Sequence, residues 1–142
     1  MKLGDADCLD HLTRGDHGIL STFHPHRLID SVPACYAVAG GRLFVPVDLV
    51  KPKSSTSLRR VDNLALEPRA TLLCERWDRN DWSRLLWVRV NLVWLPDEVE
   101  DAPDPDGPAA LLRAKYPQYR SEAFAGILAF RIDGMTGWSA GG

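Results

Sequence analysis

The sequence predicts a small, mainly β protein in which short helices close the openings of a barrel. About six runs of alternating or continuous apolar residues have the length of strands. Only short stretches, chiefly residues 54–66 and 108–116, show the spacing or the boundary signals of a helix. The chain has 142 residues, of which 45% are hydrophobic, and this is enough for one domain, 1–142, with a buried core.

The composition excludes several classes of protein. A formal net charge of −2 argues against a nucleic-acid binder. No apolar run is long enough to cross a membrane, and the N-terminal residues lack the apolar stretch of a signal peptide, so we expect a cytoplasmic protein. The three cysteines are scattered and predict neither a disulfide framework nor a zinc site. Only four of the 17 basic residues are lysines, and Lys51 and Lys53 are almost adjacent.

The first half of the chain is predicted to contain mostly short strands. In order, we expect a helix over Asp7–Thr13, a strand over Gly18–Phe23, a loop over His24–Asp30, and strands over Val32–Val38 and Leu43–Val47. Gly40 and Gly41 lie between the last two runs and predict a hairpin, because both can adopt positive φ. Pro33 and Pro46 cannot donate to a ladder, so we expect both at edges or bulges.

The second half alternates helices and longer strands. In order, we expect a helix over Ser54–Leu66, a strand over Arg69–Trp77, a polar connector to Trp82, a strand over Arg84–Leu95, an acidic surface loop over 97–107, a helix over Pro108–Tyr116, and a strand over Ile127–Ile132. Pro68 ends the first of these helices. The strand Arg84–Leu95 is apolar on both faces, which predicts either a central place in the barrel or cover by a second copy of the chain.

The segment that enters the helix over residues 54–66 is the strongest candidate for a binding site. Lys51-Pro52-Lys53-Ser54-Ser55 combines two ammonium groups, a stiffening proline and hydroxyl groups with the free amides of a helix N-terminus. Such a combination suits a phosphate. The alternative is a capped helix preceded by two solvated lysines, and the spacing alone does not choose between them. The glycines of a P-loop are missing.

Other candidates carry weaker signals. His24 and His26 share a loop, but metal binding would need further ligands at suitable spacing. No motif of a serine hydrolase or of a dinucleotide-binding site occurs. Tryptophans cluster at positions 77, 82, 87 and 94, and most are expected to anchor a core or an interface. Trp82 differs, because it lies in a polar turn near Arg84, where an exposed indole could stack on a flat ring.

Several segments together resemble a known family. They are Lys51-Pro-Lys-Ser54, Asn63-Leu-Ala-Leu-Glu-Pro-Arg-Ala70, Asp81-Trp-Ser-Arg-Leu-Leu-Trp-Val-Arg89, Tyr116-Pro-Gln-Tyr119 and Thr136-Gly-Trp-Ser-Ala140. With the order of strands and helices, they resemble the split-barrel flavin and deazaflavin oxidoreductases of the pyridoxamine 5′-phosphate oxidase-like superfamily. Within it, the chain is most similar to the actinobacterial branch of F420-dependent enzymes. The resemblance covers about residues 18–140.

The resemblance implies a six-stranded split barrel and a homodimer with two cofactor sites at its interface. The cofactor would be the deazaflavin F420, with FMN as the alternative. The residues that the family pattern assigns to the cofactor are Lys51, Pro52, Lys53, Ser54 and Ser55 for the phosphate, Val32, Pro33, Ala34, Pro46 and Val47 along the ring, Trp82 and Arg84 from the second subunit, and Arg59 as a helper on the helix.

The activity implied is hydride transfer between F420 and an unknown small organic substrate. The coenzyme supplies the chemistry, and the protein supplies binding, orientation and exclusion of water, so no acid–base constellation is needed. The arginine and histidine pair with which pyridoxamine-phosphate oxidases hold their substrate is not recognisable near the C-terminus, so that activity is not expected. The alternatives are an FMN-dependent oxidoreductase, a non-catalytic F420, flavin or haem binder (the loop histidines prompt the haem option), and a barrel that has lost its site.

Overall fold

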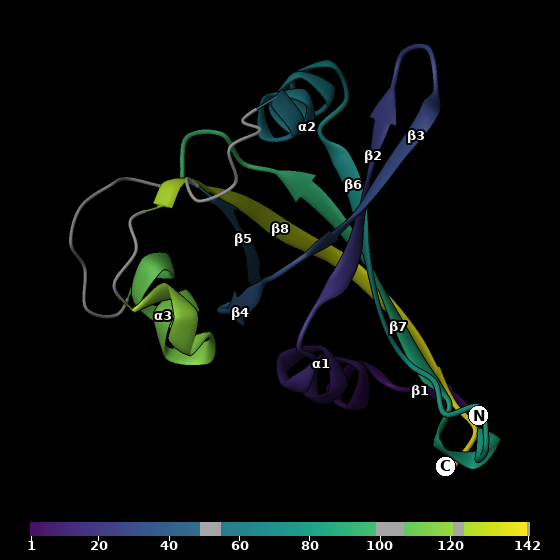
Figure 1. Ribbon diagram of the computed structural model, residues 1–142. Coiled ribbons are helices and arrows are strands. Elements are labelled where there is room, and N and C mark those ends of the chain that lie inside the picture. Colours follow the sequence, from purple (N-terminus) through teal and green to yellow (C-terminus); the bar gives the residue numbers. More distant parts are fainter. Residues whose placement is uncertain (49–54, 99–106, 121–123, 142) are drawn as a thin grey trace.

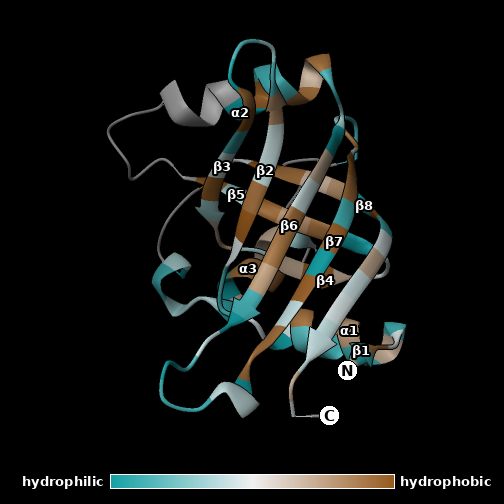
Figure 2. Cartoon of the chain, turned by 90° about the vertical axis from the view of Figure 1, so that its right-hand side faces the viewer, coloured by the Kyte–Doolittle hydropathy of each residue, from teal (hydrophilic) through white to brown (hydrophobic). Residues whose placement is uncertain are grey.

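The computed structural model describes residues 1–48, 55–98, 107–120 and 124–141, and its strands form one antiparallel sheet that curls into a barrel (Figure 1). The strands are β1 (Lys2–Leu3), β2 (Gly18–His24), β3 (Leu28–Ala34), β4 (Ala37–Ala39), β5 (Arg42–Asp48), β6 (Arg69–Arg76), β7 (Leu86–Trp94) and β8 (Phe124–Ser139). Their order is β3-β2-β6-β7-β8-β5-β4, and β1 pairs with β8. Figure 2 shows β2, β6 and β7 in front, with β5 and β4 behind them.

Short helices cover the openings, as the sequence predicts. They are α1 (Asp5–Arg14), α2 (Ser55–Leu66), α3 (Pro108–Lys115) and the one-turn 3-10 helices η1 (Trp82–Arg84) and η2 (Pro117–Tyr119). In Figure 1, α2 lies at one end of the barrel, while α1 and both chain ends lie towards the other. Cys8 and Leu12 of α1, Leu64 of α2 and Leu112 of α3 are fully buried against the sheet.

The loop predicted over His24–Asp30 is wrong. The chain turns within residues 25–27, and β3 already begins at Leu28, which has a positive φ of 71°. Nδ1 of His24 accepts hydrogen bonds from the backbone amides of His26 (3.1 Å) and Arg27 (3.0 Å). A side chain that accepts hydrogen bonds from the turn amides can thus stabilise a tight hairpin turn. The turn has no Asn-Gly or Asp-Gly pair, which is the sequence signal by which such hairpins are usually recognised.

The single strand predicted over Val32–Val38 is two strands. β3 ends at Ala34, and β4 begins at Ala37 after Cys35 and the fully buried Tyr36. β3 and β4 lie at opposite ends of the strand order, so the chain crosses here from one edge of the curled sheet to the other. With β1 and β4, which have two and three residues, the described part of the chain has eight strands rather than six.

The predictions for the hairpin glycines and the prolines are confirmed. Gly40 and Gly41 have φ of 56° and 74° and connect β4 to β5, as a hairpin turn with positive φ at both positions requires. Pro33 lies on the edge strand β3. Pro46 pairs with Ile127 of β8 on one side, and the pairing of β5 with β4 on the other side stops at Phe44. Each proline thus has one side without a neighbouring strand, where no backbone N–H is needed for a ladder hydrogen bond.

The last strand is much longer than the predicted Ile127–Ile132. β8 extends over Phe124–Ser139 and pairs with β7, with β5 and with the short β1. The polar and glycine residues after Ile132 interrupt the apolar pattern, although they continue the ladder with β7. Hydrogen bonding to two neighbouring strands therefore extends β8 beyond the residues that show an alternating apolar pattern.

Candidate functional site

The barrel has an outer face, which we define as the surface of β2, β3, β6, β7 and β8 that points away from the core. Successive side chains of a strand point to opposite sides, so the inward set builds the core and the outward set forms this face. Three outward polar residues lie side by side across the sheet, because Ser21 pairs with Thr71 and Thr71 pairs with Asn91. The outer face is therefore not uniformly apolar near its centre.

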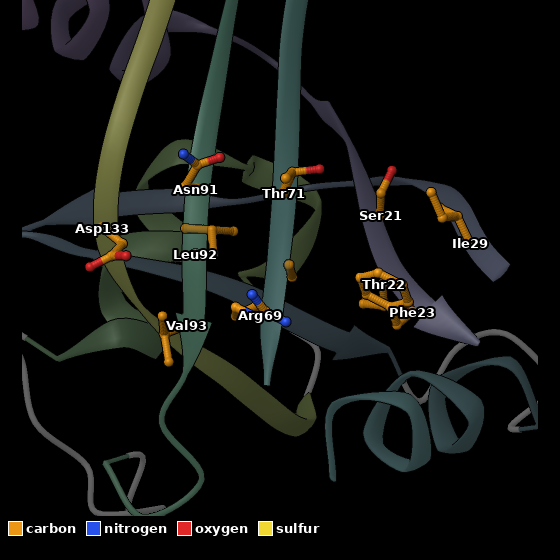
Figure 3. Close-up of a pocket in the computed structure, with 11 residues that line it drawn as sticks. Ser21, Thr22, Phe23, Ile29, Arg69, Thr71, Asn91, Leu92, Val93 and Asp133 are labelled. Atoms are coloured by element: carbon orange, nitrogen blue, oxygen red, sulfur yellow. The ribbon is translucent and has the colours of Figure 1, made fainter. Parts of the chain in front are cut away.

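A hollow of about 440 Å³ lies on the outer face, towards the α2 end (Figure 3). Its volume is in the range of small-molecule sites in proteins. It is lined by Ser21, Thr22, Phe23, Ile29, Arg69, Ala70, Thr71, Asn91, Leu92, Val93 and Asp133. The lining thus combines apolar walls with the hydroxyl and amide groups of the central polar residues.

Two apolar walls of the hollow come from the β2–β3 hairpin. Phe23 and Ile29 are directly paired across this hairpin and remain 52% and 59% exposed. Such exposure is unusual for a phenylalanine and an isoleucine side by side, and it marks a surface suited to a ligand or a partner.

The charged side chain of Arg69 stands at the rim. Its guanidinium donates from Nε to a carboxylate oxygen of Glu67 at 2.9 Å, and a second, shorter hydrogen bond joins the same two side chains. The hydrogen bonds raise the pKa of Arg69 and lower the pKa of Glu67, so both groups stay charged. Asp133 from β8 supplies the opposite charge at another part of the lining.

A buried amide fixes the hairpin relative to α2. Asn63, which is 3% exposed, donates from Nδ2 to the hydroxyl of Thr22 (3.0 Å) and to the carboxylate of Asp30 (2.9 Å). Arg27 donates two hydrogen bonds to the same carboxylate, at 3.1 and 3.0 Å. The bonds from Arg27 and then Asn63 lower the pKa of Asp30. This network therefore positions the hairpin that carries Phe23 and Ile29.

The predicted phosphate site lies mostly beyond what the structure describes. Lys51, Pro52, Lys53 and Ser54 are outside the described residues. Ser55 is the first residue of α2, and its side chain, like that of Arg59, is also outside the described part. The assignment of these residues to a phosphate stays a prediction.

The residues predicted to lie along the ring occupy β3 and β5. Pro33 is exposed and lies beside Ile19 on the outer face, whereas Val32 and Ala34 point towards the barrel interior. Pro46 is buried and Val47 is half-buried near the end of β5. The strand order separates β3 from β5, so hydrogen-bonded pairing does not bring these two sets together.

Trp82 and Arg84 lie in η1, at the end of the barrel opposite α2 (Figure 1). The indole of Trp82 is exposed and packs edge-on against Trp77, with the ring centroids 6.5 Å apart. Arg84 reaches the carboxylate of Asp78 at 3.7 Å. Within one chain these residues are remote from the hollow, so only a second copy could bring them to it.

The hollow is not recognisable in the sequence, because strand register defines it. Ser21, Thr71 and Asn91 each look like an ordinary outward polar position, and they become neighbours only through pairing. Ile29 was hidden within the segment assigned to a loop. The sequence feature that pointed towards this face was the presence of apolar residues on both sides of the strand predicted over Arg84–Leu95, which corresponds to β7.

A second cluster of titratable groups fastens α3 to the barrel. Nζ of Lys115 donates to the carbonyl of Tyr36 (2.9 Å) and lies 3.9 Å from the centroid of its ring. The hydroxyl of Tyr116 donates to the carbonyl of Asp16 (2.8 Å). Burial lowers the pKa of Lys115 and raises the pKa of Tyr116 to about 12. These groups bind one another and the backbone, so their role is structural.

The described residues contain no group of three or more histidine, cysteine or acidic side chains arranged to hold a metal ion. His24 and His26 are adjacent, with ring centroids 6.0 Å apart, but they have no further ligand of this kind. In the same part of the chain, no helix has the length and hydrophobicity required to span a membrane.

Solved structures show which fold this is. No protein-family model and no curated protein matches the chain. An FAD-binding protein from Mesorhizobium loti is similar in structure, with a TM-score of 0.64 at 15% identity over 96% of this chain and 93% of that one. A Corynebacterium glutamicum protein assigned as a pyridoxamine 5′-phosphate oxidase gives 0.61 at 11% identity over 98% of both chains. HutZ, the haem storage protein of Vibrio cholerae, gives 0.60 at 11% identity over 92% of both.

The chain therefore has the split-barrel fold of pyridoxamine 5′-phosphate oxidase-like flavin-binding proteins. The predicted fold class is confirmed at this level. Because these identities are low, the comparison establishes the fold and leaves the function to be argued from the site.

Proposed function

We propose that this protein is an F420-dependent oxidoreductase that transfers a hydride between the deazaflavin coenzyme and a small organic substrate, with FMN as the alternative coenzyme. The observation that carries the proposal is the hollow on the outer face of a split barrel, a fold shared with an FAD-binding protein. The Lys51-Pro-Lys-Ser54 segment supports a coenzyme that carries a phosphate, and the preference for F420 rests on the family resemblance described above.

The residues of the hollow suit a flat, heteroatom-rich ring. Phe23, Ile29 and Val93 offer apolar contacts to the faces of such a ring. The hydroxyl of Thr71 and the amide of Asn91 can donate to or accept from its polar edge. Lys51 and Lys53, together with the hydroxyl groups of Ser54 and Ser55, would hold the coenzyme phosphate.

The protein would contribute binding rather than acid–base catalysis. A bound deazaflavin or flavin supplies the hydride chemistry. The apolar walls would pack against the ring, and the polar residues would orient it. We also propose that the protein is a homodimer, and that Trp82 and Arg84 contact the coenzyme bound to the other subunit.

Titration with each coenzyme tests this proposal. Purified protein is titrated with F420 and with FMN, and binding is followed by coenzyme fluorescence. We expect saturable binding of F420, a large loss of affinity in Lys51→Ala/Lys53→Ala, and no loss in Lys2→Ala, which removes an exposed lysine from β1. Circular dichroism checks the fold of each variant. No saturable binding of either coenzyme would disprove the proposal, and binding of FMN alone would select the alternative.

The second candidate is a binding protein without turnover. The structural similarity to HutZ and the neighbouring imidazoles of the half-buried His24 and the exposed His26 favour haem as its ligand. A haem titration that gives a Soret shift, which His24→Ala/His26→Ala abolishes, would support this function. A tight F420 complex that reduces no acceptor among quinones, tetrapyrroles and nitro compounds would instead indicate a carrier of the coenzyme.

A further inference from the structure

A second cavity, of about 300 Å³, lies at the α1 end of the barrel (Figure 1). None of the described residues that line it also lines the hollow. Strand register forms one side of the cavity, because Arg76 of β6 pairs with Leu86 of β7, which pairs with Ser139 of β8. Leu72 and Cys74, on the same side of β6 as Arg76, are buried in the core. The cavity therefore opens at the mouth of the barrel, away from the outer face.

Helix α1 forms one wall of this cavity. Its buried residues Cys8 and Leu12 pack on the sheet. Asp7 and His11, each one position before them, are one helical turn apart and line the cavity. The packing of α1 on β8 is close, because a Cβ atom at Gly137 would lie 2.8 Å from the sulfur of Cys8. The wall that carries Asp7 and His11 therefore has a fixed place beside the strand ends.

The short helix η1 forms another wall. The carboxylate of Asp81 accepts hydrogen bonds from the amide (3.1 Å) and the hydroxyl (2.6 Å) of Ser83, and these bonds cap η1. After the helix, the carbonyl of Leu85 accepts a hydrogen bond from the amide of Ala140 (2.9 Å). Ser83 and Arg84 both line the cavity. The guanidinium of Arg84 is therefore carried by a backbone that is fixed on both sides.

The charges around this cavity are mostly positive. Arg76 and Arg84 supply two guanidinium groups, whereas Asp7 is the one acidic residue among the described residues that line it. Arg84 lies 3.7 Å from the carboxylate of Asp78. Arg76 forms no hydrogen bond or ion pair with any residue that the structure describes. Two guanidinium groups that share a small space repel one another, and an oxyanion bound between them relieves this repulsion.

The α1 wall adds groups that suit the rest of a ligand. The guanidinium of Arg14 lies 3.5 Å from Nδ1 of His11. Because a guanidinium can only donate, Nδ1 accepts, and the hydrogen of the neutral imidazole is on Nε2. An ionised Asp7 can only accept. His11 thus offers a donor, and Asp7 accepts from a hydroxyl or amino group but repels a second anionic group.

We propose that this cavity binds a small organic anion, in which a phosphate or carboxylate group contacts Arg76 and Arg84 and a hydroxyl or amino group contacts Asp7. Each planar guanidinium can donate two parallel hydrogen bonds to either oxyanion. The volume is at the lower end of the range of small-molecule sites and limits the ligand to a small molecule. Arg84 is also proposed to contact the coenzyme, so Arg76, which belongs to this cavity alone, carries the test.

Isothermal titration calorimetry of the coenzyme-free protein tests the site. It is done at physiological ionic strength, which screens loose attraction to surface charges. The probes are glycerol 3-phosphate and glycerate. We expect saturable binding of at least one of them, and the tighter ligand assigns the oxyanion as phosphate or carboxylate. Arg76→Gln should weaken this binding by about tenfold or more, because it removes charged hydrogen-bond donors.

Arg79→Gln is the matched control for this measurement. It removes the same charge from an exposed position in the β6–β7 connector that does not line the cavity, and it should leave the affinity unchanged. Circular dichroism checks the fold of each variant. The proposal would be overturned by a wild-type protein that binds neither probe, by wild-type affinity in Arg76→Gln, or by equal losses in the two arginine variants.

A substitution on α1 should have an effect of the opposite sign. Asp7→Asn should raise the affinity for inorganic phosphate, because it removes a negative charge that repels the ion. Asp5→Asn is the control, since it removes a carboxylate from the same exposed helix turn but outside the lining of the cavity. If Asp7→Asn binds phosphate no more tightly than Asp5→Asn does, the anion does not lie beside α1 and the proposal fails.

The lysine variant separates this site from the proposed coenzyme site. Lys51→Ala/Lys53→Ala should weaken F420 binding and leave the binding of the tighter organic probe unchanged. The amide NMR shifts that this probe changes should lie at His11 and Ser83 rather than at Asn91 of the hollow. Binding of the probe that the lysine variant abolishes and Arg76→Gln leaves intact would overturn this inference and support the predicted phosphate segment. Binding of the probe without binding of either coenzyme would support this inference and contradict the proposed function.

Discussion

The two faces of β6 and β7 differ in composition and in surroundings, because the inner face is almost entirely apolar, whereas the outer face mixes Leu73, Trp87 and Val93 with polar and charged residues. Leu72, Val88 and Val90 of the inner face are completely buried by the chain itself. Their neighbours on the outer face, Leu73 and Trp87, are only half-buried. β7 is central in the strand order, as one of the two predicted alternatives requires, but its outer side is not enclosed by the chain's own core. The difference teaches that a strand can be central in a sheet and still leave apolar residues half-exposed on one face, which here carries the candidate site.

The largest expected difference is between adjacent leucines of β6. Leu72→Ala should lower the free energy of unfolding by about 2–5 kcal/mol, because it leaves a cavity in the core. Leu73→Ala should cost less than about 1.5 kcal/mol, and its cost should depend on protein concentration if a second copy covers it. Urea unfolding at two protein concentrations measures both. Equal losses would show that the outer face is packed as tightly as the core.

A smaller difference is expected between two asparagines. Asn63→Ala removes the donor shared by Thr22 and Asp30, and we expect a loss of about 1–3 kcal/mol in the free energy of unfolding. Asn91→Ala on the outer face should change the free energy of unfolding by no more than about 0.5 kcal/mol. Thermal or urea unfolding of both variants gives the comparison. A mild Asn63→Ala variant would mean that water readily replaces the buried amide.

The smallest expected effect is a pH dependence from Asp30. Its hydrogen bonds with Arg27 and Asn63 lower its pKa in the folded state. The stability that it contributes is therefore present above its unfolded pKa of about 3.9 and is lost as the pH falls through the folded value. Asp30→Asn should flatten the acid side of a plot of melting temperature against pH. If the slope below about pH 4 is unchanged, this carboxylate does not carry the effect.

Local patterns predicted much of the fold. The positions of α2 and β6, and the turn at Gly40 and Gly41, follow from helical spacing, alternation and backbone freedom. Local patterns do not predict the elements whose bounds depend on contacts between distant parts of the chain. The β2–β3 turn depends on the imidazole of His24, and the length of β8 depends on hydrogen bonds to two neighbouring strands.

Less of the candidate site was accessible from the sequence. The Lys51–Ser55 segment was recognisable from local chemistry, since helix termini and charge are sequence-local features. The hollow was not, because Phe23, Thr71 and Asn91 belong to three strands that only register brings together. The role of Trp82 towards a second subunit comes from the family resemblance and stays a prediction, because η1 lies at the other end of the barrel from α2 within one chain.

The long strand β8 has a consequence for how the barrel folds. It joins β7 to β5, and it also pairs with β1 at the other end of the sequence. Its ladder therefore closes contacts between residues that are far apart in the chain, and such contacts slow folding. Until β8 docks, β7 and β5 each expose an unpaired edge that can recruit another chain. Yield on refolding should therefore fall as protein concentration rises, even for variants whose native state is unchanged.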